Sequence, residues 1–338
     1  MRPAADPGDD AGRDLAERCL APLVSRGDVP SLAYAVVRDS GVELGGFGGA
    51  APQTIFEIGS VTKVFTALLL ADLAERGQLR LADPAARYLP GGGPGQVTLA
   101  DLVTLADLAT HTAGLPRLPP RLGWFALASP GDPYVHYPAG WLVRAGRRSL
   151  RAATRPNAYT YSNYGYGLLG YLLGQAAGTP YERLVAERIC GPLGLGDTTF
   201  EVRSADRGRL AQGHARGRPA PAWHLGALAA AGGLHSTAAD LATLLRACLA
   251  PDATPLAAAI RATLAPRTAI PSGQIGLAWH HSRRGPREII WHNGMTGGFS
   301  AMIAFDPARG LGVAALADTA GALPSSLDEA VFAAVSRG

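Results

Sequence analysis

Residues 56–77 read FEIGSVTKVFTALLLADLAERG. Helix-forming residues run without a break from Ser60 to Arg76, and Gly77 stands where a helix usually stops, so a helix that begins at Ser60 is predicted. Residues three positions apart on a helix share one face, with Cβ atoms about 5–6 Å apart. The spacing in Ser60-Val61-Thr62-Lys63 therefore brings a hydroxyl and an amine within reach of each other.

Lys63 is the only lysine in a chain whose lysine and arginine residues together number 31. An arginine stays protonated in proteins, whereas a lysine can lose its proton when it is desolvated or placed beside other charges. A serine hydroxyl is a weak nucleophile and needs an adjacent base. We therefore expect Lys63 either to take the proton of Ser60 or to hold another base ionised. At a helix N-terminus, the backbone N–H of Ser60 can also help to hold an oxyanion.

Apolar strands are predicted at both ends of the chain. A helix over 11–25 precedes two strands that form a hairpin, 31–39 and 42–49. Four short apolar runs and a helix end the chain, at 275–281, 287–293, 299–307, 311–318 and about 324–336. Helical patterns occupy the middle, at 99–108, 140–153, 164–177, 181–190 and 237–249. Because a lone hairpin is marginal in water, the strands of both ends are expected to share one sheet.

The predicted fold class is α/β, of the α+β kind: an antiparallel sheet built from both chain ends, flanked by helices, with an inserted helical lobe. Residues 1–338 form a single domain in this prediction. Its sheet lobe comprises 1–83 plus 265–338, and its helical lobe comprises 84–264. A cleft between two lobes is a favoured place for small-molecule chemistry.

Tyr161-Ser162-Asn163 opens one of the helical segments and offers a phenol and an amide. A phenol near the ammonium of Lys63 has its pKa lowered, and can then exchange protons with the serine and the leaving group. Taken alone, the segment is also typical of a helix cap beside a core tyrosine.

His292-Asn293-Gly294-Met295 ends a predicted strand. Gly294 lets the backbone approach a ligand closely, and the N–H of Met295 is expected to complete an oxyanion hole with that of Ser60. His292 is expected to bind a substrate carboxylate or to tune Tyr161. A lone histidine at a strand end is also commonly structural.

Composition narrows the classes of function. The formal charge of +4 comes from scattered arginines with acidic residues among them, so no nucleic-acid partner is expected. The three cysteines are far apart and form no CxxC pattern, so no metal site or cofactor is expected, and buried thiols are predicted at Cys19, Cys190 and Cys248. The N-terminus lacks a secretory apolar stretch and no run is long enough for a membrane span, so the expectations are a cytoplasmic location and no membrane partner.

With these motifs in order, the chain resembles the serine β-lactamase and penicillin-recognising family, in the branch of class C β-lactamases, D-alanyl-D-alanine carboxypeptidases and family VIII carboxylesterases. The segments that carry the resemblance are FEIGSVTK around Ser60, ATHTAGLP at 109–116, YSNYGYGLLG at 161–170, AAGGLHST at 230–237 and HNGMTGGFSA at 292–301. The resemblance covers nearly the whole chain and implies a β-lactamase-like fold. It places the family's nucleophile on Ser60, its lysine on Lys63, its tyrosine on Tyr161 and its asparagine on Asn163.

The chain departs from the antibiotic-degrading members of that family. His292 stands where many β-lactamases have a lysine, and a neutral imidazole lacks the permanent charge that would pair with a carboxylate. Met295 stands where similar sequences often have a small residue. Met295 is therefore expected to reshape the acyl pocket, whereas His292 and the absence of a visible signal peptide disfavour a dedicated β-lactamase.

The reaction predicted from these residues is cleavage of a small ester or amide through an acyl-enzyme on Ser60, without a cofactor. An intracellular transacylase, which passes the acyl group to an amine or alcohol in small-molecule biosynthesis, is the alternative. Two less favoured hypotheses remain: a β-lactamase or D,D-peptidase, and a non-catalytic binding protein. No G-x-S-x-G, Walker A or HExxH segment supports another chemistry. A stripe of arginines at helical spacing could receive an anionic group or be a solvated face: Arg144, Arg148, Arg151 and Arg155.

Overall fold

An eight-stranded sheet forms the body of the protein in the computed structural model, which describes residues 7–90, 103–152, 158–320 and 324–337. The strand order is β2-β1-β12-β11-β10-β9-β8-β7, and every neighbouring pair is antiparallel. These strands are β1 (Leu32–Arg38), β2 (Gly41–Phe47), β7 (Thr268–Ile270), β8 (Gly273–Ile275), β9 (His280–Arg284), β10 (Arg287–Met295), β11 (Ser300–Asp306) and β12 (Leu311–Ala317).

The sheet joins the two ends of the chain. The N-terminal hairpin β1–β2 pairs through β1 with β12, with Leu32 opposite Ala317 and Val36 opposite Val313. The expected antiparallel sheet built from both chain ends is confirmed, and so is the hairpin, although its two-residue turn is Asp39-Ser40, since Gly41 already pairs with Arg38.

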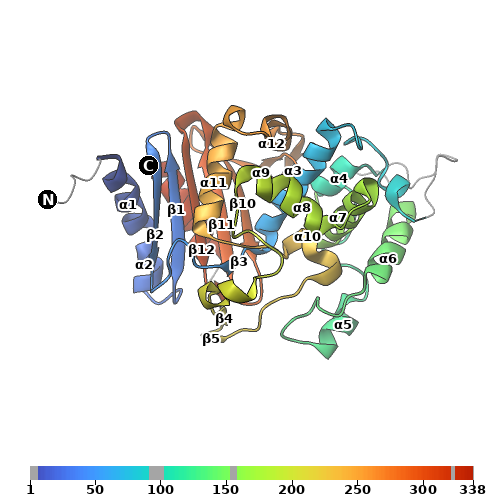
Figure 1. Cartoon of the computed structure of the whole chain (residues 1–338), viewed down its shortest axis with the longest axis horizontal. Helices are drawn as coiled ribbons and strands as arrows, with labels where there is room; N and C mark the ends of the chain where they lie inside the picture. The colour runs from blue at the N-terminus through green and yellow to red at the C-terminus, as the bar shows by residue number, and fades with distance from the viewer. Residues whose placement is uncertain (1–6, 91–102, 153–157, 321–323, 338) are drawn as a thin grey trace.

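Helices cover both faces of the sheet, as Figure 1 shows. Two amphipathic helices, α1 (Pro7–Cys19) and α13 (Pro324–Arg337), pack on one face, over an apolar cluster that includes Val36 and Met302. On the other face lie α11 (Ala238–Leu249), whose N-cap Thr237 accepts from Asp240 N–H, and the central α3 (Thr62–Glu75).

The other helices form the layer seen beside the sheet in Figure 1. They are α4 (Leu105–Ala109), α5 (Leu122–Ala128), α6 (Ala139–Ala152), α7 (Asn163–Ala177), α8 (Tyr181–Val185), α9 (Gly191–Leu193), α10 (Ala229–Gly232) and α12 (Ala257–Leu264), with α2 (Ala21–Ser25) following α1. Short strand pairs complete the fold: β3 (Phe56–Glu57) with β6 (His235–Ser236), and β4 (His214–Ala215) with β5 (Arg218–Pro219) and β13 (Thr319–Ala320).

Helix α3 is buried on every side, from Thr62 to Leu73, because α7, α10 and α12 surround it. It has no amphipathic pattern, as expected for a helix in the middle of a core. The prediction that it begins at Ser60 is wrong by two residues, since Gly59–Val61 form a turn of 3-10 helix that leads into it. Ser60 thus lies in the 3-10 turn, two residues before the α-helix.

The strand predicted over 275–281 is also wrong in part. The chain leaves the sheet between β8 and β9, where Ala278 has a left-handed φ of 69° and its N–H donates to Ala109 O at 3.2 Å. That contact ties the loop to the helical layer, a long-range interaction that alternating apolar residues do not reveal.

The three cysteines are free and buried, as predicted. Within the described residues, no helix combines the length and the hydropathy needed to cross a membrane. The division into lobes at 83/84 and 264/265 stays a prediction.

Candidate active site

Ser60 and Lys63 are in direct contact at the start of α3. Lys63 Nζ lies 2.9 Å from Ser60 Oγ, which is the contact that the three-residue spacing predicts. The amine is also 2.9 Å from Asn163 Oδ1 and 2.5 Å from the backbone oxygen of Ala231. Three oxygens, from the Ser60 turn, α7 and α10, therefore surround one nitrogen.

The surroundings of Lys63 favour the neutral amine. The side chain is fully buried, and no carboxylate is among its hydrogen-bond partners. Burial, with a smaller contribution from Arg117, holds the pKa of Lys63 well below its usual range. A neutral amine has two N–H bonds and one lone pair. Asn163 Oδ1 and Ala231 O can only accept, so they take the two N–H bonds and leave the lone pair directed toward the Ser60 hydroxyl.

Tyr161 reaches the same place from the segment before α7. Its phenol is a hydrogen-bond partner of Ser60, and Lys63 Nζ lies 4.9 Å from the centroid of its ring. The structure therefore brings together the three residues that were predicted to carry the chemistry. It also brings Asn163, whose N–H donates to the Arg117 carbonyl at 2.9 Å.

The expectation that the pKa of Tyr161 is lowered by an ammonium is not met. Burial raises the pKa of Tyr161 well above its usual value, and the hydrogen bond to Ser60 and the charge of Arg117 offset this only in part. The reason is that Lys63 is itself desolvated, so the neighbour that was expected to be cationic is held neutral. The resting phenol is protonated and suits the role of a general acid.

Strand β10 meets the Ser60 turn backbone to backbone. A Cβ on Gly294 would lie 2.0 Å from Ile58 O and 2.9 Å from Ser60 N, and one on Gly59 would lie 2.6 Å from Met295 N. Gly59 also has a φ of 49°, which favours glycine. Two glycines thus allow the amides of Ser60 and Met295 to approach each other where an oxyanion hole is expected.

His292 is fully buried on β10. Its Nδ1 lies 2.7 Å from Asn293 O, which can only accept, so Nδ1 carries the proton and Nε2 presents a lone pair. Burial keeps the pKa of His292 well below its usual value. A neutral ring with this tautomer has no donor for a carboxylate, so the geometry does not support the expected binding of a substrate carboxylate by His292.

Two residues beside Tyr161 were missed as site residues. His111 holds the segment before α7 on two sides, because its carbonyl accepts from Thr160 N–H at 2.8 Å and its Nδ1 accepts from Ser162 N–H at 3.0 Å. The ring centroids of His111 and Tyr161 are 4.4 Å apart. Arg117 lies on the other side, with its guanidinium carbon 5.1 Å from the Tyr161 centroid. Both residues belong to the region of the ATHTAGLP motif, whose presence was the available signal.

Two aromatic side chains, Tyr134 and Trp223, pack against each other beside Asn163. Tyr134 interacts with Asn163, and its ring centroid lies 5.2 Å from that of Trp223. Trp223 donates its backbone N–H to Glu57 and its indole N–H to Gly131 O. Nothing local in the sequence distinguishes Trp223, since it reaches the site through a long irregular connection.

Comparison of the sequence with known proteins identifies a family. The family described as Beta-lactamase matches residues 16–336. The chain belongs to the β-lactamase family of serine hydrolases.

Individual members of the β-lactamase family resemble the chain over different lengths. A β-lactamase of Pseudomonas fluorescens is 28% identical, over 90% of this chain and 93% of that protein. The D-alanyl-D-alanine-carboxypeptidase/endopeptidase AmpH of Escherichia coli is 33% identical, over 59% of this chain and 50% of AmpH, so the chain spans about half of that relative. The solved structure of a class C β-lactamase from Rhodobacter sphaeroides has a TM-score of 0.80 and 26% identity, over 96% of this chain and 99% of that one. The expected β-lactamase-like fold is confirmed.

The arginine stripe lies partly outside the described residues. Arg144 and Arg148 are exposed on α6, Arg151 lies in the last turn of α6 without a described side chain, and Arg155 is not described. Its proposed role toward an anionic group stays a prediction.

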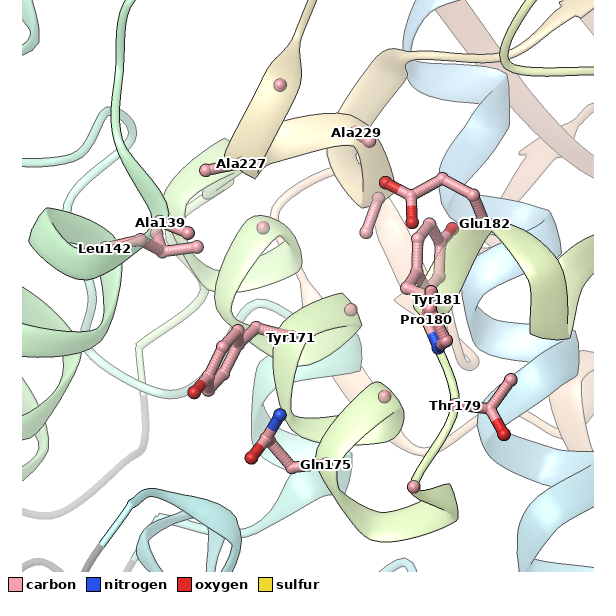
Figure 2. A pocket seen from close by; sticks show the side chains of 16 residues that line it. Ala139, Leu142, Tyr171, Gln175, Thr179, Pro180, Tyr181, Glu182, Ala227 and Ala229 are labelled. Atoms are coloured by element: carbon pink, nitrogen blue, oxygen red, sulfur yellow. The ribbon is translucent and has the colours of Figure 1, made fainter.

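Figure 2 shows a pocket of about 480 Å³ on the helical layer. Tyr171 and Gln175 of α7 lie on one side of it, and Tyr181 and Glu182 of α8 on the other. None of Ser60, Lys63 and Tyr161 lines it, so this pocket is separate from the reactive side chains.

Proposed function

We propose that the protein cleaves a small ester or amide by forming an acyl-enzyme on Ser60. The observation that carries the proposal is the environment of Lys63, a buried amine with two fixed acceptors and one hydroxyl at 2.9 Å. A neutral amine held in this way is a base directed at a single proton.

The reaction then has two halves. Ser60 Oγ attacks the substrate carbonyl carbon while its proton passes to Lys63, and the Ser60 and Met295 amides hold the oxyanion. Tyr161 gives its proton to the leaving alcohol or amine as the bond to carbon breaks, and Lys63 returns a proton to the phenolate. A water molecule attacks the acyl-enzyme in the second half, and its proton restores the Ser60 hydroxyl by the same route.

Water is the proposed second nucleophile. An amine or alcohol in its place would make the protein a transacylase, which is the alternative that the sequence leaves open. The relatives named as β-lactamase and carboxypeptidase support an amide or ester as the acyl donor. A β-lactam is not the substrate we favour, because His292 supplies neither a charge nor a donor for its carboxylate.

Mass spectrometry of the intact protein tests the proposal directly. The protein is mixed with a panel of small esters, amides and one penicillin, and we expect a mass increase equal to the acyl group for at least one ester or amide. Ser60→Ala should show no increase under the same conditions. Equal labelling of wild type and Ser60→Ala would place the nucleophile elsewhere and reject the proposal.

A competition experiment separates hydrolysis from transfer. Candidate amines and alcohols are added to the reacting ester, and the products are measured. Free acid as the main product at millimolar amine supports hydrolysis, whereas replacement of the acid by a coupled amide or ester would identify a transacylase.

A further inference from the structure

A permanent positive charge lies beside Tyr161, on the guanidinium of Arg117. We propose that Arg117 is a positioning residue for the proton chemistry: across the Tyr161 ring, its guanidinium adds to the burial that keeps the Lys63 amine neutral before attack, and it stabilises the Tyr161 phenolate as the leaving group is protonated. This inference rests on the proposed function and assigns it a residue outside the serine, lysine and tyrosine set.

Hydrogen bonds to the backbone of Arg117 fix its position next to the start of α7. Its carbonyl accepts from the N–H groups of Asn163 at 2.9 Å and Tyr164 at 3.3 Å, at the start of α7. The neighbouring Pro116 carbonyl accepts from the hydroxyl of Ser162, the N-cap of that helix. The loop and the start of α7 are thus held together, which places the backbone of Arg117 close to Tyr161; its exposed side chain extends over the Tyr161 ring.

The two basic groups share that ring. Its centroid is 4.9 Å from Lys63 Nζ and 5.1 Å from the Arg117 guanidinium carbon, so these groups lie within about 10 Å of each other. An ion pair would screen the guanidinium, but Arg117 is in no ion pair between residues that the structure describes. Its charge therefore acts on the site.

The other groups that face Lys63 and Tyr161 carry no permanent charge. Three are histidines: His111 after α4, His280 on β9 and His292 on β10. Three are tyrosines: Tyr134 before α6, Tyr159 before α7 and Tyr166 on α7. Burial lowers the pKa of His280 to about 4 and also lowers that of His111 and His292, so all three rings are neutral near pH 7. Burial raises the pKa of each of the tyrosines. Arg117 is thus the charged residue that interacts with both Lys63 and Tyr161.

The positive charge of Arg117 acts on both groups in the resting protein, and it also opposes the ammonium that forms on Lys63 as Ser60 loses its proton. It disfavours a proton on Lys63, which must be a free base when Ser60 attacks. It favours the negative form of Tyr161, which arises when the phenol proton moves to the leaving group. Removing the charge is therefore expected to raise the pKa of both groups.

A single NMR signal tests the effect of Arg117 on the protonation of Lys63, and the test does not require the protein to be active. Because Lys63 is the only lysine, protein grown with lysine labelled at 13Cε gives one side-chain resonance that reports its protonation. In Arg117→Gln we expect its titration midpoint to rise by about one pH unit at low salt, as a charge within about 10 Å implies. Arg117→Lys should restore the wild-type midpoint of Lys63; it also adds a second resonance, which is recognised because an exposed lysine titrates at about pH 10.4. The difference should shrink in 1 M NaCl, because an exposed charge is screened there.

Arg121 provides a matched control. It lies four residues later, and its guanidinium carbon is also 5.1 Å from an aromatic centroid, that of Trp141. Arg121→Gln removes the same charge and the same kind of contact elsewhere on the molecule, so the Lys63 midpoint should not move. An unchanged midpoint in Arg117→Gln, or an equal shift in Arg121→Gln, would overturn the inference.

The effect of Arg117 on Tyr161 is measured from the dependence of the Ser60 acylation rate on pH. In Arg117→Gln both limbs of the profile should move to higher pH. For a shift of one pH unit, the acylation rate on the acidic limb falls about tenfold, while the maximum rate changes little. A uniform loss at every pH would indicate a purely structural role and contradict the inference. If wild type is not acylated at any pH, the proposed function fails, whereas the NMR result still decides whether Arg117 controls Lys63.

Discussion

At Lys63 the choice of side chain is decided by protonation rather than by charge. The amine is buried without an anionic partner and contacts two oxygens that can only accept. A guanidinium cannot lose its proton there and has no lone pair to direct at Ser60. This explains why a chain that otherwise uses arginine keeps one lysine.

Lys63→Arg is expected to lower the rate of Ser60 acylation by about 10²- to 10⁴-fold, the usual contribution of a general base. Rapid-mixing mass spectrometry of the acyl-enzyme measures it. Lys63→Met, which keeps the length and removes the base, should lose as much, and thermal unfolding of both variants shows whether they fold. Acylation of a folded Lys63→Arg at the wild-type rate would contradict proton transfer to Lys63.

His111 has a left-handed φ of 61° and an acceptor nitrogen bonded to Ser162 N–H. His111→Ala leaves that buried N–H unpaired, which costs about 1–3 kcal/mol, and it strains the backbone. Because Tyr161 lies between the two N–H groups that His111 holds, we also expect at least a tenfold lower acylation rate. Asparagine tolerates this φ and offers an acceptor, so His111→Asn should recover part of both losses. Urea unfolding and the acylation assay measure them; equal losses in the two variants would argue against the hydrogen bond as the cause.

Local sequence predicts the residue-scale contact between Ser60 and Lys63, because it follows from helix spacing alone. Tyr161 and Asn163 are predicted by their motif, although the sequence does not contain the long-range packing that brings them to α3. The direction of the Tyr161 pKa was predicted wrongly, because burial of both partners outweighs the attraction that two exposed groups would have. Arg117 and Trp223 were missed for the same reason: their roles depend on segments distant along the chain.

Among elements, the contact between β10 and the Ser60 turn controls the geometry of the expected oxyanion hole. Gly294→Ala would put a Cβ 2.0 Å from Ile58 O, so the strand and the turn must separate. We expect an acylation rate about 10²- to 10³-fold lower, comparable to the loss of one oxyanion donor. Gly140→Ala in α6, where a Cβ meets nothing within 4 Å, should retain the wild-type rate. A fully active Gly294→Ala would exclude this approach of the two backbones from the mechanism.

The other face of β10 contacts α13, where Asn293 Nδ2 donates to Asp328 Oδ2 at 2.7 Å. Burial raises the pKa of Asp328 to about 6. A carboxyl whose pKa is raised on folding stabilises the protein below its unfolded pKa, near 4, and that contribution is lost as the pH rises through about 6. Asp328→Asn should therefore increase the free energy of unfolding at pH 7, by at most about 3 kcal/mol, and leave it unchanged near pH 4.

Urea unfolding at the two pH values measures this difference. Glu329→Gln is the control, since Glu329 is exposed and bonds only to the partly exposed Arg284 at 3.1 Å. Its effect should stay within about 1 kcal/mol at both pH values. An equal gain for Asp328→Asn at pH 4 and pH 7 would show that titration is not the cause.

Element types were largely predictable, because the period of the apolar residues differs between helices and strands. Boundaries were less predictable: the helix predicted over 11–25 is divided at Leu20, and the helix predicted over 99–108 is helical only from Leu105 in its described part. Two further failures are the start of α3 and the loop between β8 and β9. In both places the backbone is set by contacts with a distant segment: Gly294 of β10 against the Ser60 turn, and Ala109 of α4 against Ala278.

For the whole molecule, the pairing of β1 with β12 and the burial of α3 predict that the sheet and the helices unfold together. Phe65→Ala on α3, where the ring is fully buried, should cost about 3–5 kcal/mol and shift one common transition. Trp124→Ala should change the free energy of unfolding by less than about 0.5 kcal/mol, because that side chain is 79% exposed. Far-UV circular dichroism and tryptophan fluorescence should give coincident curves, and two separate transitions would instead indicate independently folding lobes.

The contact of Gly294 with the Ser60 turn also bears on synthesis of the protein. A ribosome makes the nucleophile early and the strand that completes its surroundings late. The growing chain therefore carries Ser60 and Lys63 for most of translation without the backbone that is expected to receive the oxyanion. Acylating power should appear abruptly as the last strands emerge, so a nascent enzyme is protected from reacting with its own substrates before it has folded.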